Sequence, residues 1–177
     1  MNAPPKPNSD ILRARAITLA RQPEAKPSAE NILEIIEFGL AHERYGLETD
    51  LVREIYPLED LTPLPCTPAF VLGIVNVRGR ILPVVDLKQF FDLPSEGITD
   101  LHRILIIQTA GMEFGILADT IVGVRGIPRD DIQPSLPTLT GIREEYLKGV
   151  TAERMVILDA ARILEDRRII VHEEVEA

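Results

Sequence analysis

The sequence predicts a mainly β protein that consists of two small, related SH3-like β-barrel subdomains with a few short helices. Short segments rich in Ile, Val and Leu, separated by Gly, Pro and Asp, dominate the chain after residue 30, as in all-β sandwiches and barrels. One ordered pattern of Gly, Pro and Asp occurs twice along the chain, which favours repeated subdomains over one large sheet. Long strand–helix–strand units are absent from the pattern, which argues against a doubly wound nucleotide-binding fold.

Residues 1–30 are predicted to form a flexible, Pro-rich leader. Between two clusters of prolines, Ser9 or Asp10 is placed to cap a short helix. The apolar residues of this stretch form only a loose stripe, so we expect it to add little to a core. The folded domain is therefore expected at residues 31–177.

Strands are expected wherever the Ile-, Val- and Leu-rich segments occur. These segments are residues 31–38, 50–56, 79–85, 103–109, 114–127 and 154–158. In the segment 50–56, successive side chains point to opposite faces, and both faces mix apolar with charged residues. We therefore expect an apolar side chain of this strand to be left for binding, unless the strand is covered on both sides.

Two brief helices are expected, and each begins at an aspartate. Asp86 opens "DLKQFF" and Asp159 opens "DAARILEDR", with apolar residues following at a spacing of three and four. An aspartate at the start of a helix stabilises its first turn by about 1 kcal/mol. We therefore interpret Asp86 and Asp159 as N-caps rather than as a general acid and base.

The repeat predicts two interleaved subdomains, the first mainly at residues 45–92 and the second mainly at 103–158, followed by a C-terminal helix. "YGLETDLVREI" aligns with "FGILADTIVGV" at a constant offset of 69, and "RILPVVDLKQFF" aligns with "ERMVILDAARIL". The matched anchors are Gly46 with Gly115, Ile55 with Val124, Leu64 with Leu136, Gly73 with Gly149 and Asp86 with Asp159.

The first copy contains three extra residues around Asn76–Gly79. Gly79 suits a turn that requires a positive φ, and Asn76 suits a turn in which the side chain bonds to nearby backbone. The sequence therefore predicts a specialised hairpin in the first copy alone.

The charge distribution restricts the class of partner. The net charge is −9, with a net of +2 in residues 1–30 and −11 in residues 31–177. Phosphate backbones and anionic membranes bind through Lys and Arg patches, so nucleic acid is not expected as a partner. No apolar run is long enough for direct membrane insertion, and the single cysteine fits a reducing cytoplasm.

The sequence offers no catalytic constellation and predicts no metal or cofactor. His42, His102 and His172 are scattered, without a second ligand at metal-binding spacing. No glycine-rich phosphate loop is present. Cys66, in "LPCTP", is interpreted as a small apolar filler. The protein is therefore not expected to be an enzyme.

"TPAFVLGIVNVRGRILPVVDLKQFF" resembles the signature of CheW-type chemotaxis coupling proteins, with its Asn-x-Arg-Gly followed by Pro-Val-x-Asp-Leu. "RYGLETDLVREIYP", "EEYLKGV" and "RMVILDAARIL" resemble further parts of that family, and the likeness runs from about residue 31 to residue 165. The resemblance implies two SH3-like five-stranded barrels with an apolar groove between them. It also implies a non-enzymatic adaptor that couples the cytoplasmic tip of chemoreceptors to the regulatory domain of the histidine kinase CheA.

The resemblance also implies roles for particular residues. Glu54 and Arg78 correspond to a structural ion pair. The residues expected at the receptor-binding surface are Val52, Gly73, Ile74 and Val75. The residues expected at the kinase contact are Leu136 and Thr138.

Two other functions are weighed against the adaptor. One is a β-barrel module that binds a small ligand or an oligosaccharide, which would need a deep polar cavity inside one barrel. The other is a hydrolase that uses Asp86, which would need oxyanion donors and a partner base that the sequence does not supply. The adaptor is the function predicted.

Overall fold

Two β-sheets carry the fold of residues 33–177, which form one of the two units of the chain; the other unit is residues 1–32. The computed structural model describes residues 31–94, 97, 101–109, 112–134 and 142–166. The predicted leader at residues 1–30 lies outside the described residues. Within the described part, strands predominate and the helices are short, so the predicted mainly β class is confirmed.

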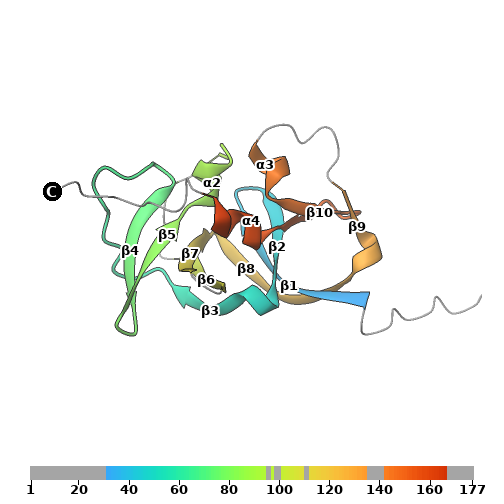
Figure 1. Cartoon of the computed structure of the whole chain (residues 1–177), viewed down its shortest axis with the longest axis horizontal. Coiled ribbons are helices and arrows are strands. Elements are labelled where there is room, and N and C mark those ends of the chain that lie inside the picture. The colour runs from blue at the N-terminus through green and yellow to red at the C-terminus, as the bar shows by residue number, and fades with distance from the viewer. Residues whose placement is uncertain (1–30, 95–96, 98–100, 110–111, 135–141, 167–177) are drawn as a thin grey trace, which may run out of the picture. The chain divides into compact units, whose positions relative to one another are not determined.

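The five-stranded sheet has the order β3-β6-β7-β5-β4. Its strands are β3 (Val52–Pro57), β4 (Val71–Val77), β5 (Arg80–Val85), β6 (Arg103–Thr109) and β7 (Met112–Ala118). Neighbouring strands are antiparallel, except that β5 and β7 are parallel, with Val84 opposite Gly115. The β4–β5 hairpin lies at the left of Figure 1.

The six-stranded sheet has the order β8-β1-β2-β11-β10-β9. Its strands are β1 (Ile32–Leu40), β2 (Glu43–Glu48), β8 (Thr120–Pro128), β9 (Ile132–Gln133), β10 (Leu147–Thr151) and β11 (Val156–Leu158). Strands β2 and β11 are parallel, with Gly46 opposite Ile157. The sixth strand, β9, is only two residues long. Short 3-10 helices, η2 (Thr49–Leu51) and η3 (Arg129–Asp131), connect strands β2 to β3 and β8 to β9.

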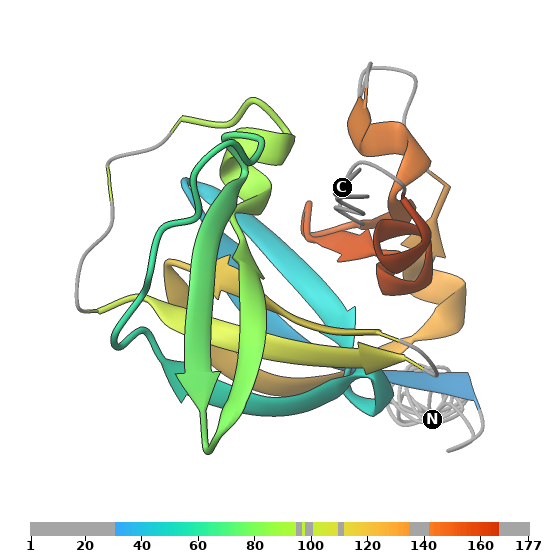
Figure 2. The same cartoon turned by 60° about the vertical axis from the view of Figure 1, so that its left-hand side comes forward.

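Each sheet takes strands from both copies of the sequence repeat. Strands β1 and β2 precede β3 in the chain but pair with strands of the second copy, and β3 pairs with β6. The sheets therefore do not coincide with the segments 45–92 and 103–158. The physical reason is that the chain crosses from one sheet to the other after β2 and again after β7, so that the copies exchange strands (Figure 2).

Three apolar clusters form the core. One lies within the five-stranded sheet and includes Val75 and Ile104, and one lies within the six-stranded sheet and includes Ile35 and Ile157. The largest joins both sheets through side chains such as those of Phe38, Tyr45, Leu105, Ile107 and Phe114. Strand β6 is buried on both faces, because Ile104 and Ile106 face one cluster and Leu105 and Ile107 another. The seam between the sheets is therefore a packed core over this length rather than an open groove.

Short helices close the ends of the sheets. Helix α2 (Leu87–Phe90) follows β5 and helix α4 (Ala160–Glu165) follows β11, while α3 (Ile142–Glu145) precedes β10. The ring of Phe90 lies against Phe70 and Tyr146, with centroids 5.1 and 5.3 Å away. These aromatic contacts fix α2 between parts of both sequence copies.

Candidate interaction surfaces

The β4–β5 hairpin has a two-residue turn. Val77 is opposite Arg80 in the register, and the two turn residues, Arg78 and Gly79, have φ values of 52° and 85°. The backbone N–H of Gly79 donates to the Asn76 side-chain oxygen at 2.8 Å. Two-residue hairpin turns with both φ values positive match the twist of the flanking strands. The predicted roles of Asn76 and Gly79 in a specialised hairpin are confirmed.

An ion-pair network ties this hairpin to β3. The guanidinium of Arg78 lies 3.1 Å from the carboxylate of Glu54, and that of Arg80 lies 3.0 Å from it. Arg80 also pairs with Glu113 of β7, and Arg53 lies 3.5 Å from Glu113. The structure thus brings Glu54 and Arg78 together, with Arg80 between the two carboxylates.

Arg80 is the arginine of this network that sequence reasoning missed. The Arg78 side chain is 74% exposed and that of Arg80 is 33% exposed. Hydrogen bonding to Glu113, together with the charges of Glu113 and Glu54, raises the pKa of Arg80 despite its partial burial. The alternation of side chains along β5 could have indicated Arg80, because it lies two residues before the buried Leu82 and so on the same face.

A second network of this type lies on the six-stranded sheet. The Glu153 carboxylate accepts from Arg125 at 2.9 Å and from Arg44 at 3.2 Å. The hydrogen bond from Arg125, followed by that from Arg44, lowers the pKa of Glu153. The buried carboxylate of Glu37 lies 3.4 Å from Arg44 and 3.6 Å from Arg125.

Strand β3 leaves an apolar side chain exposed, but it is not Val52. Val52 is half-buried and packs against the largest core cluster. Ile55 is 42% exposed, because it lies on the opposite face of the strand from Glu54 and Tyr56. A register shift between Val52 and Glu54 changes the alternation at this point. An apolar side chain of this strand is therefore left exposed, namely that of Ile55, and its use for binding stays a prediction.

The segment predicted to line an exposed apolar surface is largely covered. Val75 is 1% exposed and belongs to the core of the five-stranded sheet. Gly73 is buried, and a β-carbon added there would lie 2.2 Å from the carbonyl oxygen of Thr62. Ile74 is half-buried and forms two backbone hydrogen bonds with Thr62. The close approach predicted at Gly73 exists, but the approaching backbone belongs to the chain itself.

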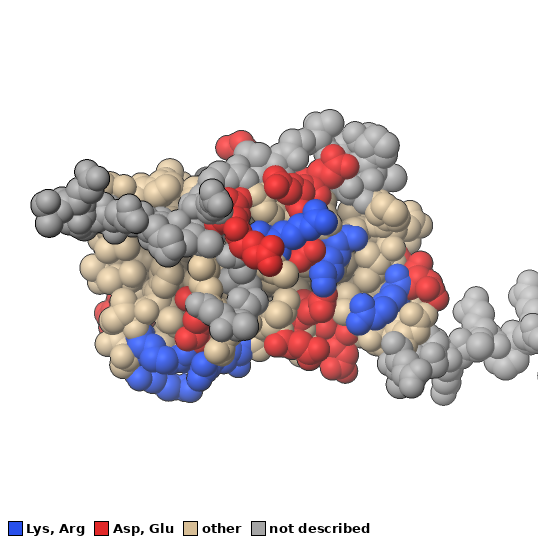
Figure 3. Space-filling view, viewed as in Figure 1, with Lys and Arg blue, Asp and Glu red and all other residues tan. Residues whose placement is uncertain are grey.

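Exposed apolar and basic side chains are found on β3 and on the β4–β5 hairpin. Ile81 is 59% exposed on β5 and is the residue next to Arg80, just as Ile55 is the residue next to Glu54. The ion pairs of Glu54 with Arg78 and Arg80 therefore join β3, which carries Ile55, to the β4–β5 hairpin, which carries Ile81. Figure 3 shows basic side chains gathered over the β4–β5 hairpin on an otherwise acidic chain. We call Ile55, Ile81, Arg53 and Arg78 the hairpin surface.

A second exposed apolar surface lies on β8, at one edge of the six-stranded sheet. Val122 is 66% exposed and Val124 is 68% exposed. Both point to the same face, because the exposed positions of β8 alternate along the strand. Val124 is the repeat equivalent of Ile55, at the offset of 69. We call Val122 and Val124 the β8 surface.

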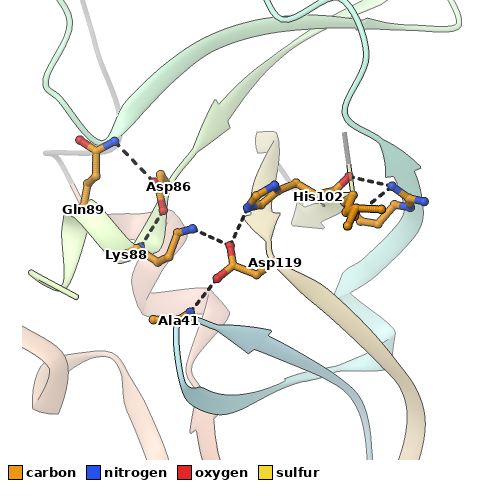
Figure 4. A network of polar contacts seen from close by, with 8 residues as sticks. Ala41, Asp86, Lys88, Gln89, His102 and Asp119 are labelled. Atoms are coloured by element: carbon orange, nitrogen blue, oxygen red, sulfur yellow. Dashed lines mark hydrogen bonds and ion pairs between the residues drawn. The ribbon is translucent and has the colours of Figure 1, made fainter. Parts of the chain in front are cut away.

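A buried polar network joins α2 to the strand connections (Figure 4). One oxygen of Asp119 pairs with Lys88 and lies 2.8 Å from the His102 ring, and the other accepts from the Ala41 N–H at 2.7 Å. Lys88 is 2% exposed. Burial raises the pKa of Asp119, but the hydrogen bonds from Lys88 and Ala41 and the positive charges nearby together lower this pKa by more than burial raises it. The net pKa shift is downward, so this carboxylate is held in its charged form.

A pocket of about 340 Å³ opens beside this network. Its lining includes Ala41, Lys88, His102 and Asp119, which come from the β1–β2 turn, α2 and the chain around β6 and β7. The pocket is therefore at a junction of elements and not inside either barrel. Its buried lysine is paired with the partly exposed carboxylate of Asp119. The sequence did not indicate this network, because its members are far apart along the chain.

The residues considered for chemistry have structural partners. Asp86 is 1% exposed and accepts from the Lys88 N–H at 2.9 Å. Asp159 accepts from the Arg162 N–H at 3.3 Å. Both aspartates thus cap helices. Cys66 is exposed, with φ of 62°, and so it is not the buried filler that was expected. The reason is that it lies on a turn of the connection between β3 and β4.

The described residues contain no cluster of three or more His, Cys, Asp or Glu side chains placed to hold a metal ion. Among the same residues, no helix combines the length and the apolar character needed to span a membrane. Leu136 and Thr138, expected at a kinase contact, lie outside the described residues, as does His172.

Comparison with known proteins gives one consistent family. The CheW-like domain family matches residues 34–168. The chain is 30% identical to the chemotaxis protein CheW of Treponema pallidum over 77% of this chain and 84% of that protein. It is 34% identical to protein FrzA of Myxococcus xanthus over 74% of this chain and 84% of that protein.

A solved structure agrees with these sequence matches. The scaffolding protein TtCheW from Thermoanaerobacter tengcongensis superposes with a TM-score of 0.65 and 33% identity, covering 71% of this chain and 88% of that one. The fold described above, with two sheets and few helices, matches that structure. The chain belongs to the CheW-like family, and it is a chemotaxis scaffold or adaptor protein and not an enzyme.

Proposed function

We propose that this protein couples chemoreceptors to a CheA-type histidine kinase in a chemosensory array, in the cytoplasm at membrane-associated receptors. The observation that carries the proposal is the pair of exposed apolar surfaces on different sheets, the hairpin surface and the β8 surface. An adaptor that holds two partners at once needs two separate docking surfaces. Exposed apolar side chains grouped on an otherwise polar surface mark interaction sites.

The hairpin surface is assigned to the receptor. It combines Ile55 and Ile81 with Arg53 and Arg78, which suits an amphipathic receptor helix that carries acidic residues beside its apolar face. It lies next to Val52, Gly73, Ile74 and Val75, the residues predicted for receptor binding. In this proposal Gly73 and Val75 support the surface from beneath, because neither is exposed.

The β8 surface is assigned to the regulatory domain of the kinase. It carries the exposed Val122 and Val124, and the neighbouring Arg125 is paired with Glu153, so a mainly apolar contact is favoured. The kinase assignment of Leu136 and Thr138 remains a prediction.

Binding measurements with paired variants test the assignment. We expect Ile55→Ser with Ile81→Ser to weaken binding of a receptor cytoplasmic fragment roughly tenfold, and Val122→Ser with Val124→Ser to do the same for the kinase regulatory domain. Each variant should keep its affinity for the other partner, which serves as the control for folding. If both variants bind both partners as the wild type does, the proposed surfaces are wrong. If each loses the opposite partner, the two assignments are reversed.

The small-ligand alternative is not favoured by any described cavity. The pocket beside Asp119 lies outside the barrels, and the buried Lys88 that faces it is already paired. We therefore retain the adaptor as the function.

A further inference from the structure

The parallel strand pair in one sheet is the repeat equivalent of the parallel pair in the other. In the five-stranded sheet β5 lies beside β7, with Val84 opposite Gly115. In the six-stranded sheet β11 lies beside β2, with Ile157 opposite Gly46. Val84 and Ile157 are related by the offset of 73 that relates Asp86 to Asp159, and Gly46 and Gly115 by the offset of 69. The two contacts therefore have the same register.

The charges at these equivalent contacts are reversed. Arg80, at the start of β5, pairs with Glu113 of β7. At the equivalent place before β11 stands Glu153, which pairs with Arg44 of β2 at 3.2 Å. The offsets of 73 and 69 relate Arg80 to Glu153 and Glu113 to Arg44.

The third member of each network reverses as well. Arg80 is also held by Glu54 of β3, at 3.0 Å. Glu153 is also held by Arg125 of β8, at 2.9 Å. Strands β3 and β8 are repeat equivalents, and each lies in the same sheet as the central residue that it holds. A basic centre held by two acids thus corresponds to an acidic centre held by two bases.

The apolar residues at the two parallel strand contacts are alike. The β-carbon position of Gly46 lies against the side chains of Ile35 and Ile157, and that of Gly115 lies against Ile104 and Val84. Both glycines therefore make room for branched apolar side chains of the same kind. The segments "RILPVVD" and "ERMVILD" share their apolar pattern and their final aspartate. Burial of their apolar side chains should therefore stabilise pairing with β2 and pairing with β7 to a similar extent.

We propose that the reversed ion pairs select the exchanged topology over a self-closed one, in which each sequence copy pairs its own strands. Self-closure would place β5 beside β2 and β11 beside β7. The first pairing sets Arg80 beside Arg44, and the second sets Glu153 beside Glu113. Like charges brought within ion-pair distance on neighbouring strands repel each other, so the self-closed form is opposed at both contacts while the exchanged form is favoured at both.

The partial burial of the network makes this selection effective. The side chains of Arg80 and Glu113 are 33% and 18% exposed, and charges that are partly buried are screened less by salt than exposed ones. Arg44 and Glu153 are more exposed, at 45% and 56%. The contact in the five-stranded sheet is therefore the stronger determinant of the two.

Three variants of the full-length chain test the proposal. The first, Arg80→Glu with Glu153→Arg, makes both native contacts repulsive and both self-closed contacts attractive. The second adds Arg44→Glu and Glu113→Arg, which restores opposite charges at the native contacts. All three variants also carry Glu37→Gln and Arg53→Gln, because Glu37 contacts Arg44 and Arg53 contacts Glu113. The first two variants then keep the same mismatches to Glu54 and Arg125, so the difference between them reports the strand partners. The third, Arg80→Met with Glu153→Gln, removes the charges without reversing them.

Refolding from urea and NOEs between backbone protons are the measurements. We expect the first variant to regain the native Val84–Gly115 and Gly46–Ile157 NOEs in a yield roughly tenfold lower than the third, with NOEs between Val84 and Gly46 in the folded remainder. The second variant should recover the native NOEs.

Two results overturn the proposal. One is that the first variant refolds to the native NOEs in the same yield as the charge-free third variant. The other is that the second variant refolds no better than the first while the third folds normally. If the first variant does not fold at all, recovery in the second still decides in favour of the proposal.

Discussion

Gly73 lies directly beneath the backbone of Thr62: a β-carbon on Gly73 would come within 2.2 Å of the Thr62 carbonyl oxygen. Thr62 and Ile74 exchange two backbone hydrogen bonds of 2.9 Å, which keep the two segments together. The φ of Gly73 is +146°, a region that residues with side chains rarely adopt. Gly73 is therefore required by the fold for two independent reasons.

Gly73→Ala is expected to destabilise the domain more than Gly123→Ala. Gly123 has nearly the same φ, +144°, but nothing lies within 4 Å of its β-carbon position. The two substitutions thus share the backbone strain, and only the first adds a clash, which typically costs about 1–3 kcal/mol. Urea unfolding of both variants measures the difference. Equal free energies of unfolding would show that the segment around Thr62 moves aside freely.

Arg80→Ala is expected to lower stability more than Arg78→Ala. Arg78 is 74% exposed and makes one ion pair, and such surface pairs contribute under about 1 kcal/mol. Arg80 is less exposed and holds both Glu54 and Glu113, which are left close together when it is removed. Thermal unfolding of the two variants compares them directly. A lower melting temperature for Arg78→Ala would contradict the central place given to Arg80.

Asp119 is expected to contribute to the loss of stability in acid. Its pKa in the folded protein is below its ordinary value of 3.8, so the unfolded chain binds this proton more readily than the folded one. The stabilisation is complete above the unfolded pKa and is lost as the pH falls through the lower, folded pKa. Asp119→Asn should therefore be less stable than the wild type at neutral pH, and the gap should narrow below about pH 4. The urea unfolding midpoints of both proteins at a series of pH values measure this difference in stability. A difference that stays constant into acid would refute the role given to Asp119.

The helix cap at Asp86 is expected to matter more than that at Asp159. Asp86 is 1% exposed and accepts at 2.9 Å, whereas Asp159 accepts at 3.3 Å near the surface. Loss of a capping side chain costs about 0.5–2 kcal/mol, so Asp86→Ala should fall at the upper end and Asp159→Ala at the lower. Asn at either position retains the acceptor and provides the control. Equal losses for Ala and Asn would mean that capping is not the role.

Local features of the fold could be predicted from the sequence. Turn residues such as Asn76 and Gly79, and the strand-to-helix steps at Asp86 and Asp159, depend on neighbours within a few residues. The repeat was also visible, because Gly and Asp anchors recur in order.

Features that depend on strand exchange could not be predicted in the same way. Which strands pair across the repeats decides that Val75 is buried, that Ile55 is exposed and that Arg80 reaches Glu113. The approach of Thr62 to Gly73 and the network around Asp119 likewise join segments distant in sequence. A pattern of alternating residues gives the two faces of a strand, but not what covers each face.

The most direct test of the coupling function is a bridging experiment with three purified components. A receptor cytoplasmic fragment is clustered on vesicles, and sedimentation of the kinase regulatory domain is measured with and without this protein at micromolar concentration. We predict that the kinase domain sediments with the receptor only when the protein is added, and that the variant with Val122→Ser and Val124→Ser itself sediments but leaves the kinase domain in solution. Competition between receptor and kinase domain for the protein, or failure of the wild type to bring the kinase domain down, would contradict the account.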